Sequence, residues 1–198
     1  MTSAPTKMRV AAGQHPDNDR EYLDFARQLG CPGVSFQTPK IKGTKRWEAQ
    51  DIIDFLKPAR DLGLYVESIE NVPNQFFDKI MLGVEGRDEQ LENMKHTIRA
   101  LGEAKVPILG MHWMPQSVWR TEMGHYGRGD SYVSVYDHSI IEDRSRDKEI
   151  WVARRDEQSP DLKDTFTRGS FVPLPIHSLT HDQMWANFEW FIKGIIKT

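Results

Sequence analysis

Cysteine is almost absent from this sequence: Cys31 is the only one among 198 residues, so an internal disulfide is excluded. A chain without disulfides is typical of a reducing compartment. No hydrophobic run approaches the ~18 residues of a membrane-spanning helix, and the first residues lack the apolar core of a signal peptide. These absences favour a cytoplasmic protein with no membrane partner.

Excess charge of either sign is also lacking. The formal net charge is −3, and no basic stripe with interleaved aromatic residues runs along the chain. Proteins that bind nucleic acid need such a positive surface to neutralise phosphates, so nucleic acid is not an expected partner. At 198 residues, the chain is long enough for one substantial hydrophobic core.

The sequence does contain a repeated alternation of short apolar runs and amphipathic segments. The apolar runs predict strands at residues 8–12, 33–37 and 64–69, and a fourth that begins at residue 106. Apolar residues at steps of three and four predict helices at about 18–29, 47–62, 88–104 and from 181 onward, with a short helical turn around 76–82. This alternation indicates parallel strands joined by right-handed helical crossovers.

Local signals refine the helix boundaries. Asn18 with Glu21, and Thr180 with Gln183, have the spacing of capping boxes, which mark helix starts. Pro58 falls inside the second helix and is expected to kink or split it, because proline has no N–H to donate. Two apolar faces are expected to be buried, one on the first helix and one on the last: Tyr22, Leu23, Phe25, Ala26 and Leu29; and Met184, Trp185, Phe188, Phe191, Ile192 and Ile195.

The regular pattern stops between about residues 114 and 179. The alternation from Tyr132 to Tyr136 predicts an edge strand or a hairpin arm. The segment from Glu142 to Gln158 is mostly charged, which favours a solvated or mobile excursion over a core element. An extended stretch is expected where Pro173 and Pro175 follow. We interpret 114–179 as a long irregular insertion.

The number of predicted βα units is too small for a closed eight-stranded barrel. A complete (β/α)₈ barrel takes ~250 residues, and this chain has four predicted strands. We therefore expect an α/β fold, a partial TIM barrel in which residues 1–198 form one domain, the amino-terminal half. A doubly wound sheet is the rival fold, weakened because no Gly-x-Gly-x-x-Gly follows the first strand. An open barrel face would favour a homo-oligomer, self-association or a completing partner.

Candidate site residues follow from the rule that barrel enzymes work at the carboxyl ends of their strands. Leu109 and Met111 share the face expected to meet helices, whereas Ile108, Gly110 and His112 share the face toward the barrel interior. His112, at a strand end, is the first candidate for proton transfer with a substrate.

Substrate contacts are expected from other polar residues near strand ends and in the loops. Guanidinium groups bind carboxylates through two parallel donors, and carboxylates or amides can bind hydroxyls. The expected substrate-binding residues are Arg120, Arg128, Glu67, Glu70, Gln37 and Trp113. Two of them have a structural alternative: Glu67 could form an internal ion pair, and Trp113 could serve in packing. We assign no metal ligand in this chain and interpret His15 as a loop histidine without a special role.

Several motifs together resemble one enzyme family. In order they are Glu67-Ser-Ile-Glu-Asn-Val-Pro, Gly86-Arg-Asp-Glu-Gln-Leu-Glu-Asn, Thr97-Ile-Arg, His112-Trp-Met-Pro, Trp119-Arg-Thr, Gly127-Arg-Gly and the helix Met184-Trp-Ala-Asn-Phe-Glu-Trp-Phe. Their order and spacing are similar to those of mannonate dehydratase. The likeness covers most of residues 8–130 and 178–196.

The resemblance implies a xylose-isomerase-like TIM barrel that dehydrates D-mannonate, a small sugar acid, to 2-dehydro-3-deoxy-D-gluconate in hexuronate (glucuronate) breakdown. It also implies a divalent metal, manganese or iron. The family's metal ligands begin with a His-Pro-Asp-Asp-Pro segment that this sequence does not contain. We therefore expect a metal-dependent hydro-lyase when the protein is complete, and an inactive chain without a complete metal site here. Two alternatives stay open: a sugar isomerase or epimerase on the same barrel, and a non-catalytic remnant or half-barrel that needs a partner.

Overall fold

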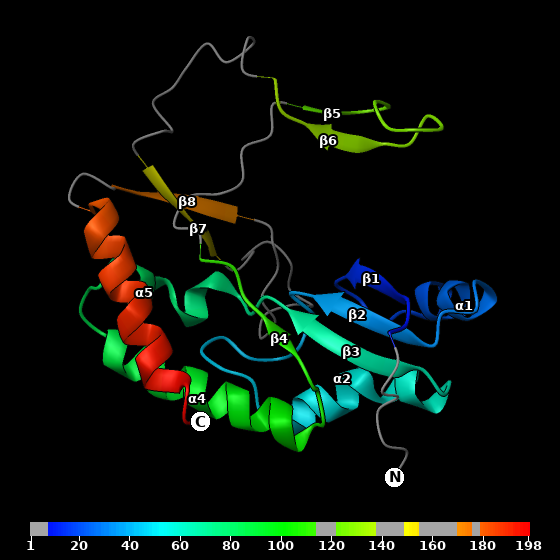
Figure 1. Cartoon of the computed structure of the whole chain (residues 1–198), viewed down its shortest axis with the longest axis horizontal. Coiled ribbons are helices and arrows are strands. Elements are labelled where there is room, and N and C mark those ends of the chain that lie inside the picture. Colours follow the sequence, from blue (N-terminus) through cyan, green and yellow to red (C-terminus); the bar gives the residue numbers. More distant parts are fainter. Residues whose placement is uncertain (1–7, 114–121, 138–148, 155–169, 176–178) are drawn as a thin grey trace.

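A four-stranded parallel sheet organises the protein (Figure 1). The computed structural model describes residues 8–113, 122–137, 149–154, 170–175 and 179–198. The strands lie in chain order: β1 (Ala11–His15), β2 (Gly33–Gln37), β3 (Tyr65–Glu70) and β4 (Leu109–Gly110). Every neighbouring pair is parallel, which confirms the predicted βα units. The sheet is not a closed barrel, and the fold is α/β with the character of a partial TIM barrel.

Strand boundaries depend on the neighbouring strand. β2 matches its prediction, but β1 starts at Ala11 rather than Met8. Ala11 pairs with Gly33, the first residue of β2, so the residues before it have no strand to pair with. Met8 and Val10 are accordingly exposed. β4 is only two residues long, because its pairing with β3 covers Leu109 and Gly110 alone.

Helices connect the strands: α1 (Arg20–Gln28), α2 (Ala49–Asp61), α4 (Arg87–Glu103) and, after the insertion, α5 (His181–Ile195). The cap of α1 is Asp19, one residue later than predicted; its carboxylate accepts from the backbone N–H of Tyr22 at 2.9 Å. The capping box of α5 at Thr180 and Gln183 is confirmed. α2 continues through Pro58 and is not split. Pro58 and Asp54 are both exposed, so water can satisfy the carbonyl that proline leaves without a donor.

A short helical connection follows β3. It consists of the 3₁₀ turn η1 (Asn74–Phe76) and α3 (Asp78–Leu82), close to the turn predicted at 76–82. α5 packs across α3 and α4, so a helix more than 75 residues later in the chain closes over this connection (Figure 1). The amide of Asn187 on α5 donates to the carbonyl of Met81 on α3 at 3.0 Å.

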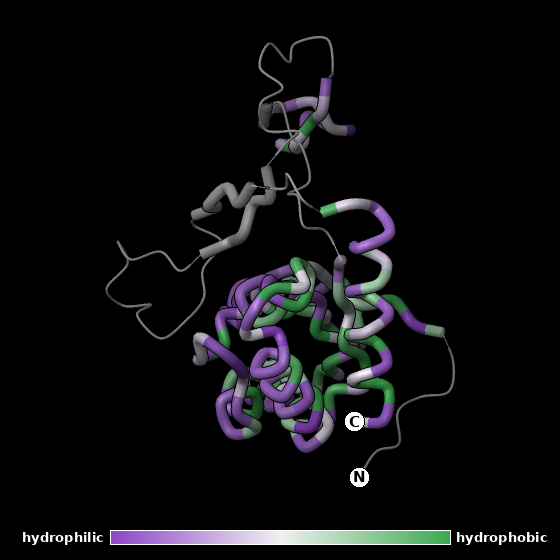
Figure 2. The backbone as a smooth tube through the Cα atoms, turned by 90° about the vertical axis from the view of Figure 1, so that its left-hand side faces the viewer, coloured by the Kyte–Doolittle hydropathy of each residue, from purple (hydrophilic) through white to green (hydrophobic). Residues whose placement is uncertain are grey.

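The hydrophobic core lies between the sheet and the helices. Figure 2 shows hydrophobic segments gathered in the compact lower body. Its largest fully buried side chains are Trp47, Phe36, Phe76, Phe77, Phe191, Leu23, Ile41, Ile52, Leu56, Ile69, Ile80 and Met81. The buried faces of α1 and α5 are both narrower than predicted. Phe25 and Leu29 of α1 and Trp185 of α5 are exposed, because they lie on helix sides that no other described element covers.

Two antiparallel hairpins lie within the insertion. β5 (Glu122–Gly124) pairs with β6 (Val133–Val135), which confirms the predicted hairpin arm. β7 (Glu149–Arg154) pairs with β8 (Ser170–Pro175). The charged segment 142–158 was predicted to be a solvated or mobile excursion rather than a core element; within it, residues 149–154 form β7, which belongs to a separate two-stranded sheet. Both hairpins stand outside the four-stranded sheet (Figure 1).

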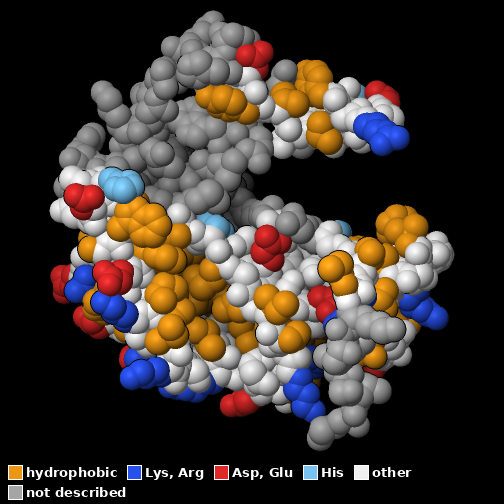
Figure 3. Space-filling view, viewed as in Figure 1, with side chains coloured by type: hydrophobic (Ala, Val, Ile, Leu, Met, Phe, Trp, Pro, Cys, Tyr) orange, Lys and Arg blue, Asp and Glu red, His pale blue; other side chains and the backbone are white. Residues whose placement is uncertain are grey.

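The sheet has two open edges among the described residues, at β1 and at β4. Ile108, predicted to face the barrel interior, is 58% exposed just before β4. Leu109 and Met111 pack against the core, as predicted for the opposite face. Figure 3 shows hydrophobic side chains over α5 and along the front of the sheet. None of the helices in the described ranges is long and apolar enough to cross a membrane.

Candidate active-site rim

An ion pair lies on the inner face of the sheet, near the amino ends of the strands. Glu67 is an extra residue in β3, where the register with β2 shifts between Val34 and Ser35. Its carboxylate lies over Gly33 and pairs with the guanidinium of Arg9 through two contacts. Both side chains are less than one-fifth exposed. The ion pair given as the alternative for Glu67 is therefore present.

Small polar residues form the middle of the inner face. The hydroxyl of Ser68 donates to the hydroxyl of Ser35 at 2.9 Å, across β3 and β2. A side chain added at Gly13 would lie 3.6 Å from the Cβ of Ser35, so Gly13 belongs to the same face. These residues leave space above the sheet that larger side chains would fill.

The carboxyl ends of β2, β3 and β4 form a continuous rim. Gln37 pairs with Glu70, and Glu70 pairs with Gly110. The backbone N–H of Thr38 donates to the carbonyl of Glu70 at 2.7 Å, which extends the pairing past the end of β2. A side chain at Gly110 would meet Cγ of Glu70 at 3.4 Å, so Glu70 projects over the same face as Gly110. The predicted neighbours Gln37 and Glu70 thus come from adjacent strand ends.

His112 follows this rim two residues after β4. Its ring meets the ring of Phe77 edge-on, with centroids 6.0 Å apart. Phe77 is fully buried at the start of α3, so one side of the imidazole rests against a fixed apolar wall. His112 therefore stands at a strand end of the rim with one side of its ring packed against the core.

Trp113 serves mainly in packing. Its ring stacks on Phe191 with centroids 5.5 Å apart and meets Phe188 edge-on at 5.1 Å. Its indole N–H points to the sulfur of Met184, 3.2 Å away. Trp113 therefore joins the end of β4 to α5, and the packing alternative stated for it is confirmed.

Two arginines, Arg120 and Arg128, are predicted to bind the substrate carboxylate, and the structure describes the second of them. Arg120 lies outside the described residues. Arg128 lies in the turn between β5 and β6, where Gly129 and Asp130 both have positive φ values. Its side chain is exposed, and the hairpin that carries it stands apart from the sheet (Figure 1). The described residues do not bring Arg128 to the rim.

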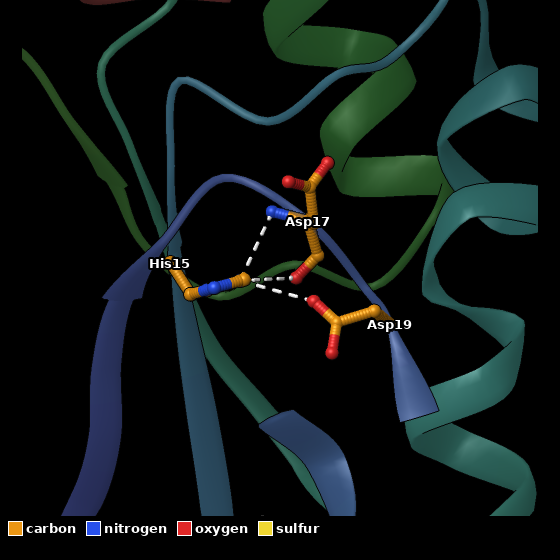
Figure 4. A group of neighbouring side chains, drawn as sticks. All are labelled: His15, Asp17 and Asp19. Carbon is orange, nitrogen blue, oxygen red and sulfur yellow. Dashed lines mark hydrogen bonds and ion pairs between the residues drawn. The ribbon is translucent and has the colours of Figure 1, made fainter. Parts of the chain in front are cut away.

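Sequence reasoning missed a group at the end of β1. The register with β2 shifts between Ala12 and His15, and His15 stacks on Tyr22 of α1 with centroids 4.4 Å apart. His15 therefore faces α1 rather than the inner face. Asp17 and Asp19 lie beside it (Figure 4). A spacing of two residues between each of the three, directly after a strand, is a signal that could have revealed the group.

Tyr22 supports the position of His15. Its hydroxyl donates to the carbonyl of Ala12 at 2.9 Å. Burial raises the pKa of Tyr22 to about 12, so the phenol stays protonated near neutral pH and the hydrogen bond to β1 persists.

A divalent metal on the inner rim does not fit the described donors alone. Within the described ranges, three or more metal-ligating side chains meet at His15, Asp17 and Asp19, which are beside α1. Among its described residues, the rim itself offers two possible metal-ligating side chains, Glu70 and His112. Metal sites in enzymes commonly use at least three protein ligands. We therefore derive no catalytic step through a metal from the described rim.

Comparisons with known proteins agree on one family. A family model described as D-mannonate dehydratase (UxuA) matches residues 8–198. The mannonate dehydratase of Streptococcus pneumoniae is 23% identical over 173 residues, which are 85% of this chain and 45% of the relative. That of Thermotoga neapolitana is 33% identical over 135 residues, 67% of this chain and 37% of the relative.

A solved structure shows the same fold. The crystal structure of mannonate dehydratase from Streptococcus suis serotype 2 matches with a TM-score of 0.66 and 21% sequence identity. The match covers 97% of this chain and 50% of that chain. This chain therefore spans about half the length of the relatives it matches, or less.

Proposed function

This chain belongs to the D-mannonate dehydratase family, and we propose that it supplies the amino-terminal half of a hydro-lyase that converts D-mannonate to 2-dehydro-3-deoxy-D-gluconate in hexuronate breakdown. The observation that supports the proposal is the rim: Gln37 and Glu70 are the paired last residues of β2 and β3, and His112 follows β4, at the end of the sheet where barrel enzymes bind substrates. The boundaries of the domain, 1–198 with an insertion at about 114–179, are part of the same proposal.

Dehydration of a sugar acid needs two proton transfers. A weakly acidic proton next to the carboxylate must be removed, and a hydroxyl must leave with a proton. We assign His112 to one of these transfers, because its ring is fixed by Phe77 at the end of the rim. Glu70 and Gln37 are assigned to binding substrate hydroxyls from the adjacent strand ends.

The substrate carboxylate needs positively charged partners. Arg120 and Arg128 are proposed for this role on the chemistry of the guanidinium group, which bonds a carboxylate through two parallel donors. Alanine variants of each, assayed separately in the complete gene product, test the assignment. A clamp residue should raise the KM for D-mannonate, and an unchanged KM removes that arginine from the site.

The complete enzyme is proposed to use manganese or ferrous iron, which would stabilise the negative charge that develops on the substrate. Since the described rim offers too few ligands for such an ion, we propose that the 198-residue chain alone does not turn over. Assay of this chain with D-mannonate and either metal tests the point, and measurable turnover contradicts it.

The decisive experiment uses the complete gene product with D-mannonate and added Mn²⁺ or Fe²⁺. Formation of 2-dehydro-3-deoxy-D-gluconate, followed by NMR, supports the proposal. Conversion to an isomer without loss of water would instead assign the barrel to a sugar isomerase or epimerase. Absence of any product removes the lyase assignment and favours a non-catalytic half-barrel.

Self-association through the open barrel face is proposed for the isolated chain. Ile108 is exposed at the β4 edge, and an open strand edge with exposed hydrophobic side chains favours contact with another chain. Sedimentation of the chain tests this, and a stable monomer at high concentration contradicts it. We also propose a cytoplasmic location, supported by the single cysteine.

A further inference from the structure

The four-stranded sheet stops at two open ends, and both carry exposed hydrophobic side chains. The first, here called the β1 end, comprises the residues before β1 and one side of α1, with Met8, Val10, Phe25 and Leu29. The second, the β4 end, comprises the residue before β4 and one side of α5, with Ile108, Trp185 and Ile196. Among the described residues, the other exposed large hydrophobic side chains are Val84 and three tyrosines near β5 and β6. Exposed hydrophobic surface is therefore concentrated where the sheet stops.

On α1, the exposed side chains lie on the side of the helix that contacts β1. Tyr22, Phe25 and Leu29 follow one another at steps of three and four, so they share one side of the helix. The hydroxyl of Tyr22 donates to the carbonyl of Ala12 in β1 at 2.9 Å, and its ring stacks on His15 at the end of the same strand. Phe25 and Leu29 therefore continue the surface beside the free edge of β1.

On α5, one side is covered by α4 and the opposite side is open. A Cβ atom at Gly194 would lie 2.8 Å from the methyl carbons of Leu91 on α4, so Gly194 marks the covered side. At about 100° per residue, Trp185, Ile192 and Ile196 lie roughly half a turn away from Gly194. Trp185 is 58% and Ile196 72% exposed, so the described elements leave this side open.

The two ends expose hydrophobic side chains at the same height along the strands. Val10 and Ile108 directly precede β1 and β4, and Leu29 and Ile196 are the C-caps of α1 and α5. Helices in parallel βα units run opposite to the strands, so a helix C-cap lies level with the amino ends of the strands. The β1 end of one copy can therefore face the β4 end of another with hydrophobic side chains at matching heights.

A second copy of the chain offers what both ends need. β1 and β4 each need a parallel neighbour on a free edge. Two copies related by a twofold axis place β4 of each beside β1 of the other, and their strands together make the eight of a closed barrel. Each exposed side chain of the two ends leaves roughly 100 Å² uncovered. A dimer contains two sets of them, so about 1,400 Å² would be buried, within the ~1,200–2,000 Å² of stable interfaces.

We propose that two copies of this chain associate head to tail, β1 end against β4 end, and close one eight-stranded parallel barrel with two identical seams. A head-to-tail contact of this kind closes after two copies and does not grow into a filament. The arrangement rests on the self-association proposed above for the isolated chain, and it names the partner and the contact surface.

Analytical ultracentrifugation of the 198-residue chain measures the assembly, and a dimer that dissociates on dilution is expected. Leu29→Glu at the β1 end and Ile196→Lys at the β4 end each put a charge into both seams, so each should weaken dimerisation about tenfold or more. Val84→Glu is the matched control. Val84 is exposed between α3 and α4, which contact the covered side of α5, so the affinity of this variant should stay within about twofold of the unaltered chain.

Mixing the two weakened variants shows whether the contact is head to tail. In a mixed pair, one seam joins the two substituted positions, whose charges are opposite, and the other seam joins an unaltered Leu29 to an unaltered Ile196. A 1:1 mixture of Leu29→Glu and Ile196→Lys should therefore form dimers at a concentration where each variant alone is monomeric. Recovery of the dimer also shows that both variants are folded.

A chain that stays monomeric at its highest soluble concentration overturns this arrangement and the self-association on which it rests. Assemblies larger than two overturn it because the ends then meet without closing. A dimer that either single variant leaves intact, that Val84→Glu weakens as much, or that mixing does not restore uses another surface, and overturns the head-to-tail barrel alone. The lyase proposal is judged separately, by turnover of the complete gene product.

Discussion

Replacement of Gly83 by alanine tests how α5 closes over the sheet connection. Gly83 ends α3 with φ +67°, a left-handed backbone that favours glycine. A Cβ atom there would lie 2.7 Å from Oδ1 of Asn187 and 2.8 Å from its Nδ2. The Asn187 amide would have to move, and the hydrogen bond that it donates to the carbonyl of Met81 would be lost.

The expected destabilisation has two parts. A side chain in the left-handed region costs about 1–2 kcal/mol, and the smaller entropy of the unfolded alanine chain returns about 0.4–1 kcal/mol of that. Loss of the Asn187 hydrogen bond adds about 1 kcal/mol. Gly63→Ala is the matched control, because Gly63 has φ +76° but no atom within 4 Å of the added Cβ. Gly83→Ala should therefore lower the free energy of unfolding by about 1 kcal/mol more than Gly63→Ala does.

Urea unfolding of the variants measures this difference. In an Asn187→Ala background the contact is already gone, so Gly83→Ala should then lower stability only as much as Gly63→Ala does. Equal losses for the two glycine variants in the unaltered chain would refute the reasoning, because they would show that α5 does not press on the end of α3. The reasoning would also be refuted if Gly83→Ala still lowered stability more than Gly63→Ala in the Asn187→Ala background.

Three further variants test the rim and the core. His112→Ala in the complete gene product should lower kcat for D-mannonate about 100-fold or more, as expected when a proton-transfer group is removed; a kcat within a few-fold would exclude that role. Gly110→Ala should leave stability within about 0.5 kcal/mol but raise KM, because its methyl group meets Cγ of Glu70 at 3.4 Å on the substrate face; an unchanged KM would place the substrate elsewhere. Thr97→Val should destabilise the chain by about 1–3 kcal/mol in urea unfolding, since the buried hydroxyl accepts from the backbone N–H of Trp47 at 3.3 Å; no loss would show that water or another group replaces it.

Segments with a long and regular pattern could be predicted from the sequence. α4 begins and ends within one residue of its expected bounds, because Leu91, Met94 and Leu101 on one face of it are buried against the core. The four parallel strands and the rim at their carboxyl ends follow from the same local patterns. The pairing of Gln37 with Glu70 is a consequence of parallel register.

Features that depend on pairing between strands could not be predicted in this way. The extra residue in β3, Glu67, shifts the alternation, so Val66 and Ile69 are both buried although they are three residues apart. A similar shift in β1 turns His15 toward α1. β7 is a further example: the segment around it is mostly charged, but its own residues 150–153 are apolar, and they form a strand by pairing with β8.

A structure of the complete gene product with D-mannonate bound would show where the substrate lies. The sugar acid should lie at the carboxyl ends of the four parallel strands, within hydrogen-bonding distance of His112 and of Glu70 or Gln37. A sugar acid bound at the amino ends of the strands, near Arg9 and Glu67, or anywhere out of reach of His112, would contradict this prediction.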